Sequence, residues 1–225
     1  MENIIVKTES LKKYYEIGPH TVKALDGVDL EIREREFISI IGKSGCGKST
    51  LLHMIGGLDS PTSGTVIVDG MNLSKMNQEQ LALFRRRKAS FIFQQYNLIP
   101  DLNVYDNIIF PLELDGGHID TSLIQELLTA LHLEDKAGMF PSMLSGGEQQ
   151  RTAIARALAV KPAILLADEP TGNLDTSASH EVIGLLKVIA KKYRQTLIVI
   201  THDLDIAQMA DRTIQLQNGK IWRGE

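Results

Sequence analysis

Residues 37–58 read FISIIGKSGCGKSTLLHMIGGL, and this stretch decides the fold. The apolar run at residues 37–41 has the composition of a central parallel strand. Residues 42–49 then match the phosphate-loop pattern G-x-x-x-x-G-K-[ST] and lead into an apolar helix. A strand, a glycine-rich loop and a helix in this order predict a nucleoside triphosphate site, although glycine turns between strand and helix are also common structural features.

The residue types of this loop suit phosphate binding. Glycines allow a tight turn that points several amide N–H groups at one anion, and the helix adds the positive end of its dipole. Lys48 reaches the β- and γ-phosphates, and the Ser49 hydroxyl is a ligand for Mg²⁺. We predict that the loop binds nucleotide through Gly42, Lys43, Ser44, Gly45, Cys46, Gly47, Lys48, Ser49 and Thr50.

Length and composition limit the class of protein. The 225 residues suit one large domain, or one domain with an inserted subdomain, and the formal net charge of -4 disfavours nucleic acid as a partner. The single cysteine excludes an internal disulfide. No apolar run approaches the roughly 18 residues of a membrane span, and the first residues lack the apolar core of a signal peptide. We expect a cytoplasmic protein that reaches a membrane only through a partner.

The order of expected elements predicts an α/β fold. Antiparallel strands at residues 4–15, 22–32 and 65–68, with turns at 18–19 and 26–27, surround the phosphate loop. A helix at 77–88 and a strand at 89–93 come next in the chain. Helices then dominate residues 95–160. Strand and helix alternation resumes at 163–209, with a final hairpin turning at 218–219. We predict one domain, residues 1–225. It comprises a mostly parallel core with a β subdomain (residues 1–94 and 161–225) and an inserted helical subdomain (about 95–160).

Two adjacent carboxylates end the apolar strand expected at residues 164–168. Ligands sit at the carboxyl ends of parallel strands, and neighbouring side chains on a strand point in opposite directions. Asp168 is suited to hold Mg²⁺, and Glu169 is suited to act as general base on the attacking water. The structural alternative is a helix or turn cap at Asp-Glu-Pro.

A second glycine-rich segment, LSGGEQ at residues 144–149, discriminates between classes of nucleotidase. Ser145 is a predicted N-cap, and Gly146 and Gly147 allow close approach of the backbone. The result is a second helix end built to receive phosphate. Such an end is useful if it closes on ATP held by another subunit.

Together these motifs resemble the ATP-binding cassette family along nearly the whole chain. The resemblance implies ATP and Mg²⁺ as cofactors, with a signature segment that includes Ser145, Gly146, Gly147 and Glu148. Asn173-Leu174-Asp175 resembles the loop that crosses the dimer interface, and His202 the switch histidine at the γ-phosphate. Gln94, with Gln95 as the alternative, resembles the glutamine that senses Mg²⁺. Tyr15, with Tyr14 beside it, resembles the aromatic residue that stacks on adenine. The implied catalytic residues are Glu169, His202 and Lys48, and the implied metal ligands are Ser49, Gln94 and Asp168.

The family also implies partners. Two cassettes face each other head to tail, and each ATP lies between one phosphate loop and the signature helix of the other copy. A membrane permease receives the motion, so the cassette is peripheral on the inner face of the membrane. The segments at residues 91–108, 144–151 and 166–175 resemble the branch of macrolide exporters, lipoprotein-releasing cassettes and bacitracin-resistance cassettes. This branch implies export, extraction or sensing of peptides, lipids or drugs, and a cell-division cassette is the alternative.

Three further alternatives concern the class of cassette. A DNA-repair cassette requires a long coiled-coil insertion between the two glycine-rich segments, and a translation-factor cassette requires two cassettes in tandem. A degenerate cassette that only clamps ATP is disfavoured by the presence of both Glu169 and His202. The basic run 85–88 suggests nucleic acid or, more simply, a solvated helix end whose cations suit the dipole.

Overall fold

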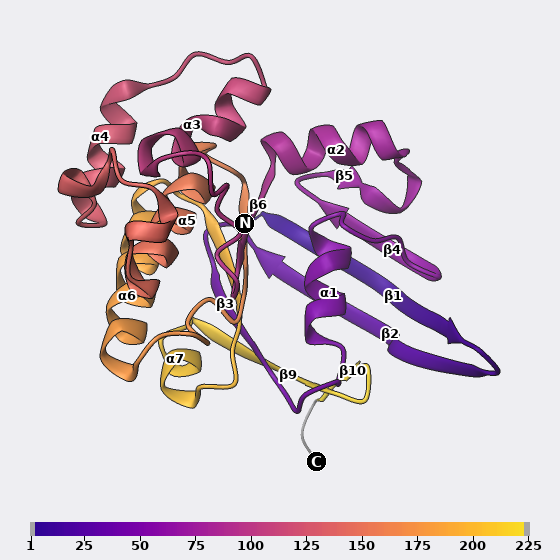
Figure 1. Cartoon of the computed structure of the whole chain (residues 1–225). Helices are drawn as coiled ribbons and strands as arrows, with labels where there is room; N and C mark the ends of the chain where they lie inside the picture. Colours follow the sequence, from indigo (N-terminus) through magenta and orange to yellow (C-terminus); the bar gives the residue numbers. More distant parts are fainter. Residues whose placement is uncertain (1–2, 223–225) are drawn as a thin grey trace.

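The computed structural model describes residues 3–222 and contains two sheets (Figure 1). The first sheet is antiparallel, with strand order β2-β1-β4-β5. Its strands are β1 (Ile4–Ile17), β2 (His20–Arg33), β4 (Ser63–Val68) and β5 (Met71–Asn72). It is the antiparallel β portion that the sequence predicted.

The second sheet has the order β10-β9-β3-β8-β7-β6, and all its pairs are parallel except β9 with β10. Its strands are β3 (Phe37–Ile41), β6 (Ala89–Phe93), β7 (Ile164–Asp168), β8 (Thr196–Ile200), β9 (Arg212–Gln217) and β10 (Lys220–Ile221). The predicted α/β class with a mostly parallel sheet is confirmed. The predicted turn at 218–219 joins β9 to β10.

Helices cover both faces of this sheet (Figure 1). On one side lie α1 (Lys48–Ile55) and α2 (Gln78–Arg87), next to the antiparallel sheet. On the other side lie α3 (Val104–Leu114), α4 (Thr121–Ala130), α5 (Gly146–Ala159), α6 (Thr176–Lys192) and α7 (Leu204–Gln208). Short 3-10 turns occupy Leu73–Lys75, Glu134–Lys136 and Pro141–Met143.

Alternate side chains of the central strands belong to two different hydrophobic cores. Along β7, Leu165 and Ala167 join the core on the helical side, whereas Ile164 and Leu166 join the core shared with α1 and the antiparallel sheet. Side chains that are successive on a strand point to opposite faces, so an almost continuous apolar run is needed to fill both layers. This explains why the buried strands of the sequence show no polar alternation.

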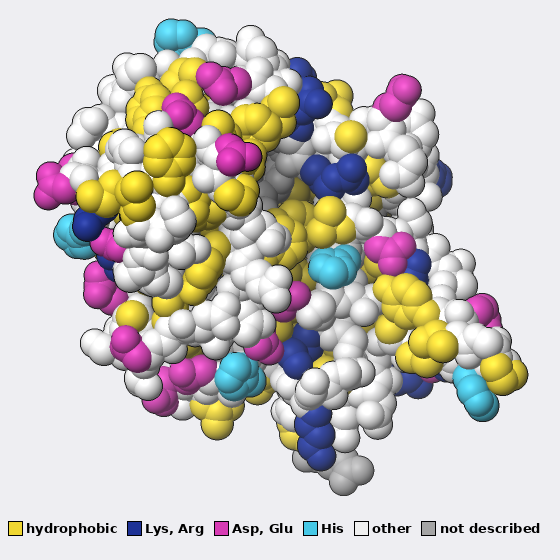
Figure 2. Space-filling view, in the orientation of Figure 1, with side chains coloured by type: hydrophobic (Ala, Val, Ile, Leu, Met, Phe, Trp, Pro, Cys, Tyr) yellow, Lys and Arg dark blue, Asp and Glu magenta, His cyan; other side chains and the backbone are white. Residues whose placement is uncertain are grey.

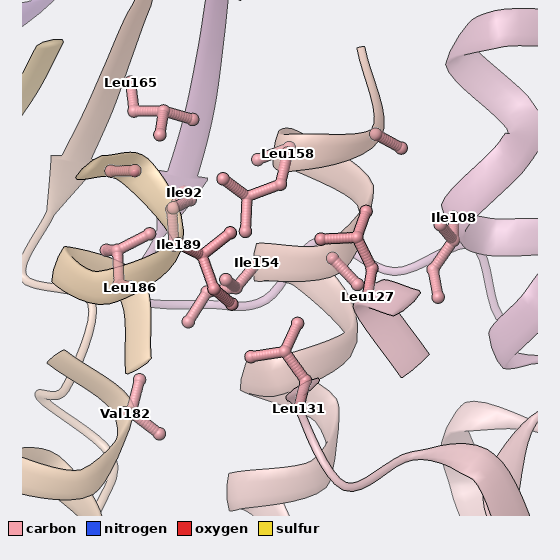
Figure 3. Close-up of a cluster of buried hydrophobic side chains, with 14 of the residues drawn as sticks. Ile92, Ile108, Leu127, Leu131, Ile154, Leu158, Leu165, Val182, Leu186 and Ile189 are labelled. Carbon is pink, nitrogen blue, oxygen red and sulfur yellow. The ribbon is translucent and has the colours of Figure 1, made fainter. Parts of the chain in front are cut away.

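The inserted helices share the first core with the sheet. Figure 3 shows Leu127 of α4 and Leu131, which follows this helix, facing Ile154 and Leu158 of α5, with Ile108 of α3 beside them. The same cluster continues through Ile92, Leu165, Val182, Leu186 and Ile189. The helical region therefore rests on one side of the sheet through a continuous apolar contact that is centred on α5.

The expected turn at Asp26-Gly27 is wrong. The hairpin turns at Gly18-Pro19, as predicted, and β2 continues through Asp26. The pairing shifts by one residue here, from Leu11 with Val28 to Lys12 with Asp26, and Gly27 has φ +88°. Gly27 is thus a bulge inside a long strand, where a glycine supplies the left-handed conformation that the extra residue needs.

The basic run at the end of α2 is used within the chain. Arg85 Nη1 donates to the Gly57 carbonyl oxygen at 2.6 Å, and Arg87 Nε donates to both carboxylate oxygens of Asp115 at 3.0 Å. Lys88 Nζ donates to Asp69 at 2.7 Å. These contacts agree with the simpler interpretation of the run as a helix end. Within residues 3–222, no helix is both long and apolar enough to cross a bilayer.

Candidate nucleotide site

The phosphate loop connects β3 to α1, as the sequence predicted. Its shape is fixed by two close backbone approaches. A Cβ on Gly42 would lie 2.3 Å from the Leu216 carbonyl oxygen, and a Cβ on Gly47 would lie 2.2 Å from that of Ala24. Both glycines have positive φ, +153° and +105°. Leu216 belongs to β9 and Ala24 to β2, so two distant parts of the chain position this loop.

The turn after β9 also supports the loop. The Gly219 N–H donates to the Cys46 carbonyl oxygen at 3.0 Å, and the Asp26 N–H donates to the Gly219 carbonyl oxygen at 2.8 Å. Cys46 is buried, which leaves the exposed Lys43, Ser44 and Gly45 at the outer surface of the loop. These residues are accessible to a ligand.

Lys48 lies folded against the loop that it belongs to. Its Nζ donates to the carbonyl oxygens of Gly42 at 2.9 Å and Lys43 at 3.1 Å. The ammonium is thus held against the backbone of the loop by two neutral acceptors rather than by a carboxylate. A phosphate is a stronger, charged acceptor for the same group.

The predicted metal ligands and general base meet in one cavity. A cavity of about 410 Å³ is lined by Ser49, Phe93, Gln94, Gln95, Asn97, Asp168 and Glu169. The strands explain this meeting, because Phe93 of β6 pairs with Asp168 of β7 and the next residues leave the sheet at the same edge. Both Gln94 and Gln95 line the cavity, so the choice between them stays a prediction. Figure 2 shows basic, acidic and histidine side chains around the hollow between the helix-rich half and the half carrying β1 and β2.

Glu169 and His202 face each other. His202 Nδ1 lies 3.4 Å from Glu169 Oε2, and the imidazole is 70% exposed while the carboxylate is 30% exposed. Glu169 has φ +46°, and its N–H donates to the Ile200 carbonyl oxygen at 3.0 Å. A left-handed conformation is unfavourable for glutamate. This conformation turns the chain away from β7 immediately after Asp168, so the side chains of Asp168 and Glu169 point in different directions.

The oxygen donors of the cavity fit Mg²⁺ bound with a nucleotide. Among residues 3–222, no group of three or more His, Cys, Asp or Glu side chains forms a metal site on its own. The donors at this edge are one carboxylate (Asp168), one hydroxyl (Ser49) and one amide (Gln94). Mg²⁺ in nucleotide enzymes is usually held by one or two carboxylates and completes its shell with phosphate oxygens and water. A set of one carboxylate and two neutral donors leaves room for both.

The signature helix begins as predicted. Ser145 is the N-cap of α5, and its side chain forms a capping box with Glu148. The Ser145 N–H donates to Glu148 Oε2 at 2.8 Å, and the Glu148 N–H donates to Ser145 Oγ at 3.3 Å. These bonds lower the pKa of Glu148, the N–H of Ser145 contributing most and its hydroxyl next. Gly146 lies under Tyr96, whose hydroxyl would be 2.8 Å from an added Cβ.

Asp175 also caps a helix. Its Oδ1 accepts the Ala178 N–H at 2.9 Å at the start of α6. Asp175 was expected in the loop that crosses a dimer interface, and the cap gives it a structural role in the single chain. Asn173 in the same loop donates from Nδ2 to the Gln94 carbonyl oxygen at 2.9 Å, which ties this loop to the segment that follows β6.

Tyr15 lies on the face of β1 that points towards α1. Its hydroxyl donates to Asp59 Oδ2 at 3.0 Å, just beyond the end of α1, and burial with this bond raises the pKa of the phenol. Lys13, two residues away, also reaches Asp59, at 2.7 Å. Tyr14 points the other way and bonds to Asp26. Of the two tyrosines, Tyr15 is therefore the one on the phosphate-loop helix side.

Arg156 was missed by the sequence reasoning. Its Nη1 donates to the Asn97 carbonyl oxygen at 2.7 Å, and its Nη2 donates to that of Tyr96 at 3.0 Å. Burial lowers the pKa of the guanidinium. The sequence does hold a signal for it, since Arg156 stands between Ala155 and Ala157 on an otherwise buried stretch of helix, where an arginine needs a specific partner.

These features define the class: a phosphate-loop nucleoside triphosphatase with a second glycine-led helix end. A family model described as "ABC transporter" matches residues 25–172. The chain belongs to this family, and it is an ATP-hydrolysing cassette subunit. The predicted ATPase subunit of an ABC transporter is thereby confirmed.

Three relatives place the chain more closely. The ABC transporter ATP-binding protein MJ0796 of Methanocaldococcus jannaschii is 41% identical over 98% of this chain and 97% of its own. The lipoprotein-releasing system ATP-binding protein LolD of Legionella pneumophila is 40% identical over the full length of both. The macrolide export ATP-binding/permease protein MacB of Chlorobaculum tepidum is 41% identical over 96% of this chain but only 33% of its own. A solved dimer of MJ0796 bound to ADP and Pi matches with a TM-score of 0.89 over 98% of each chain.

Proposed function

We propose that two copies of this chain close on two ATP molecules and drive a membrane permease of the lipoprotein-release and macrolide-export branch. The relatives described above favour this branch over the cell-division alternative. The observation that carries the proposal is the single cavity at which Ser49, Gln94, Asp168 and Glu169 meet, with His202 against Glu169. The proposed consequence for the cell is export or extraction of a lipid-bearing, peptide or drug cargo.

Each residue has a role that its position supports. The loop amides and Lys48 hold the β- and γ-phosphates, and Lys48 exchanges its two carbonyl acceptors for phosphate oxygens. Glu169 accepts the proton of the attacking water, and His202 contacts the γ-phosphate while it keeps Glu169 oriented. Tyr15 stacks on adenine.

Ser49, Gln94 and Asp168 would hold Mg²⁺, which neutralises the charge that develops on the phosphates when it is bound. Removing the metal with EDTA is expected to abolish ATP hydrolysis, and adding Mg²⁺ is expected to restore it. Hydrolysis that continues at full rate in EDTA would exclude this assignment.

The signature segment acts on the ATP of the second copy. Among the described residues, Ser145, Gly146 and Gly147 do not line the 410 Å³ cavity of their own chain. The N-terminus of α5 is therefore available to another anion. Two copies related by a twofold axis can each supply the missing half of the other's site. ATP then joins the two copies, and its hydrolysis weakens the contact. Residues 95–160 act as the helical subdomain that transmits the change.

The permease docks beside Gln94. A groove of about 400 Å³ runs between residues 95–100 and residues 141–142, and Tyr96, Leu98 and Pro141 form part of its wall. Met143, which is 68% exposed, follows at its edge. Val104, in contrast, is fully buried and belongs to the core, and Tyr105 packs against that core. Docking of a permease helix here holds the chain at the cytoplasmic face of the membrane.

Sizing of a trapped variant tests the proposal. Glu169→Gln is expected to bind ATP without hydrolysing it and to scatter light as a dimer with ATP and as a monomer with ADP. Glu113→Gln, an exposed change on α3, is the matched control and should hydrolyse ATP like the wild type. A Glu169→Gln chain that stays monomeric at saturating ATP would refute the two-copy mechanism. Unaltered hydrolysis would remove Glu169 from its role.

A further inference from the structure

A second cavity, of about 460 Å³, opens at the end of the central sheet away from the nucleotide. Its apolar wall comes from Phe37, the first residue of β3, Leu197 near the start of β8, and Ala190 on α6. The phosphate loop follows the other end of β3, so the two sites lie at opposite ends of one strand. We call this feature the basal cavity. Its size is within the range of pockets that bind small organic molecules.

An unsatisfied amide lines the basal cavity. Gln195 is 4% exposed, and neither its Nε2 nor its Oε1 has a hydrogen-bond partner among the described residues. Its backbone is fixed, because the Gln195 N–H donates to the Ala190 carbonyl oxygen at 2.8 Å. Buried polar groups in proteins are nearly always paired, and an unpaired one is unfavourable by about 1–3 kcal/mol. A donor and acceptor that enter the cavity would satisfy this side chain.

The rim of the basal cavity is basic. Arg35, Lys191 and Arg194 line it, and within residues 3–222 their side chains form no ion pair. Lys187 also lines it and donates to the Met209 carbonyl oxygen at 2.6 Å. This concentration of cations is notable in a chain whose net charge is -4.

The two carboxylates of the lining are already engaged. Asp211 Oδ2 accepts the Phe37 N–H at 2.9 Å. Glu36 accepts the Arg33 N–H at 2.9 Å and lies 3.4 Å from Arg212 Nε. The lining holds four cations (Arg35, Lys187, Lys191 and Arg194) against two carboxylates, and Glu36 is paired with Arg212 outside the lining. The rim therefore has a net positive charge next to an apolar wall and a buried amide.

We propose that the basal cavity binds a small organic anion. Its carboxylate or phosphate group would bind Arg35, Lys191 and Arg194, and its apolar part would rest on Phe37 and Leu197. A hydroxyl or amide on the ligand would pair with Gln195. The site is separate from the ATP site, and the proposal does not depend on the role assigned to any nucleotide-binding residue.

Phenyl phosphate is the probe for this site. The full wild-type chain is saturated with Mg²⁺ and ADP so that the phosphate loop is filled, and phenyl phosphate is titrated while the Gln195 side-chain amide is followed by NMR. Gln195→Leu assigns this signal by its loss. We expect a saturable shift with a dissociation constant of about 1 mM. Phenol, which lacks the charge, should bind at least ten times more weakly, and so should inorganic phosphate, which lacks the ring.

Variants separate a built site from general charge. Lys191→Ala together with Arg194→Ala should weaken binding about tenfold or more, whereas Arg87→Ala on the opposite side of the sheet should leave it unchanged. Gln195→Leu lacks the reporting amide, so its binding is measured from the ³¹P signal of phenyl phosphate. This variant should bind more weakly and resist urea better, since it removes an unpaired amide. A Gln195 signal that does not move with phenyl phosphate, or that moves without saturating, would overturn the proposal. Equal binding by the Lys191→Ala/Arg194→Ala chain would also overturn it, even if Gln195→Leu failed to fold.

Discussion

The guanidinium of Arg156 is bonded to the carbonyl oxygen of Asn97, 59 residues earlier in the chain, at 2.7 Å. A second bond reaches Tyr96, so the signature helix α5 holds the segment that follows Gln94 by its backbone. Asn173 holds the carbonyl of Gln94 itself. Gln94, the proposed metal ligand, is therefore positioned from two directions, by α5 and by the loop before α6.

Arg156→Met should slow hydrolysis more than it lowers stability. The apolar side chain preserves much of the packing but releases the carbonyl oxygens of residues 96 and 97, which are near solvent and can be hydrated. We expect kcat to fall by about tenfold, because a small displacement of a group in the active site strongly lowers the rate. The melting temperature should change little. Arg87→Met is the control, since Arg87 is an exposed side chain that bonds the half-buried carboxylate of Asp115. Equal kcat for the two variants would show that Arg156 does not position the glutamine.

Asn107 should be essential for the loop that leads into α3. It is fully buried; its Oδ1 accepts the Ile99 N–H at 2.8 Å, and its Nδ2 donates to the Leu102 carbonyl oxygen at 2.8 Å. Asn107→Leu leaves these backbone groups unpaired, and we expect a loss of about 2–4 kcal/mol in the free energy of unfolding. The exposed cap variant Asn77→Ala should lose about 1 kcal/mol. Urea unfolding compares them, and a loss of 1 kcal/mol or less for Asn107→Leu would contradict the prediction.

Gly47→Ala should prevent the phosphate loop from adopting its normal conformation. Its Cβ would be 2.2 Å from the Ala24 carbonyl oxygen in a residue at φ +105°. Strain and overlap together predict a loss of about 2–5 kcal/mol, measured without nucleotide. Gly116→Ala separates the two causes, because Gly116 has φ +66° with open space around it, and should lose only about 1–2 kcal/mol. Similar losses for both would show that the contact with Ala24 is unimportant.

Glu148 should contribute a pH-dependent term to stability. Its pKa is lowered in the folded chain, first by the Ser145 N–H. The contribution is thus present above the pKa of the unfolded carboxyl and is lost as the pH falls through the folded value. Glu148→Gln keeps the capping box but removes the charge. The variant should be less stable than the wild type at pH 7, by about 1 kcal/mol or less. The difference should shrink towards zero in acid. A difference that is constant with pH would contradict this assignment.

The sequence predicted those parts of the fold that depend on local chemistry. The loop at 42–49, the Ser145 cap and the strand at residues 196–200 are set by neighbouring residues, and they lie where expected. The sequence alone predicts a turn at Gly27, because a bulge and a turn use the same residue type and differ only in the partner strand. Arg156 and the basal cavity could not be predicted either. Their significance depends on contacts between segments far apart in the chain.

The support of the phosphate loop by β9 and the following turn has a consequence for biosynthesis. Leu216 is translated 174 residues after Gly42, and Gly219 is translated 173 residues after Cys46, yet they touch the loop at these two positions. A nascent chain still lacking these residues cannot assemble the loop in its final shape, even though residues 37–58 emerged long before. The cassette therefore acquires its affinity for ATP only after β9 and the turn that follows it have left the ribosome, which keeps shorter nascent chains from sequestering nucleotide.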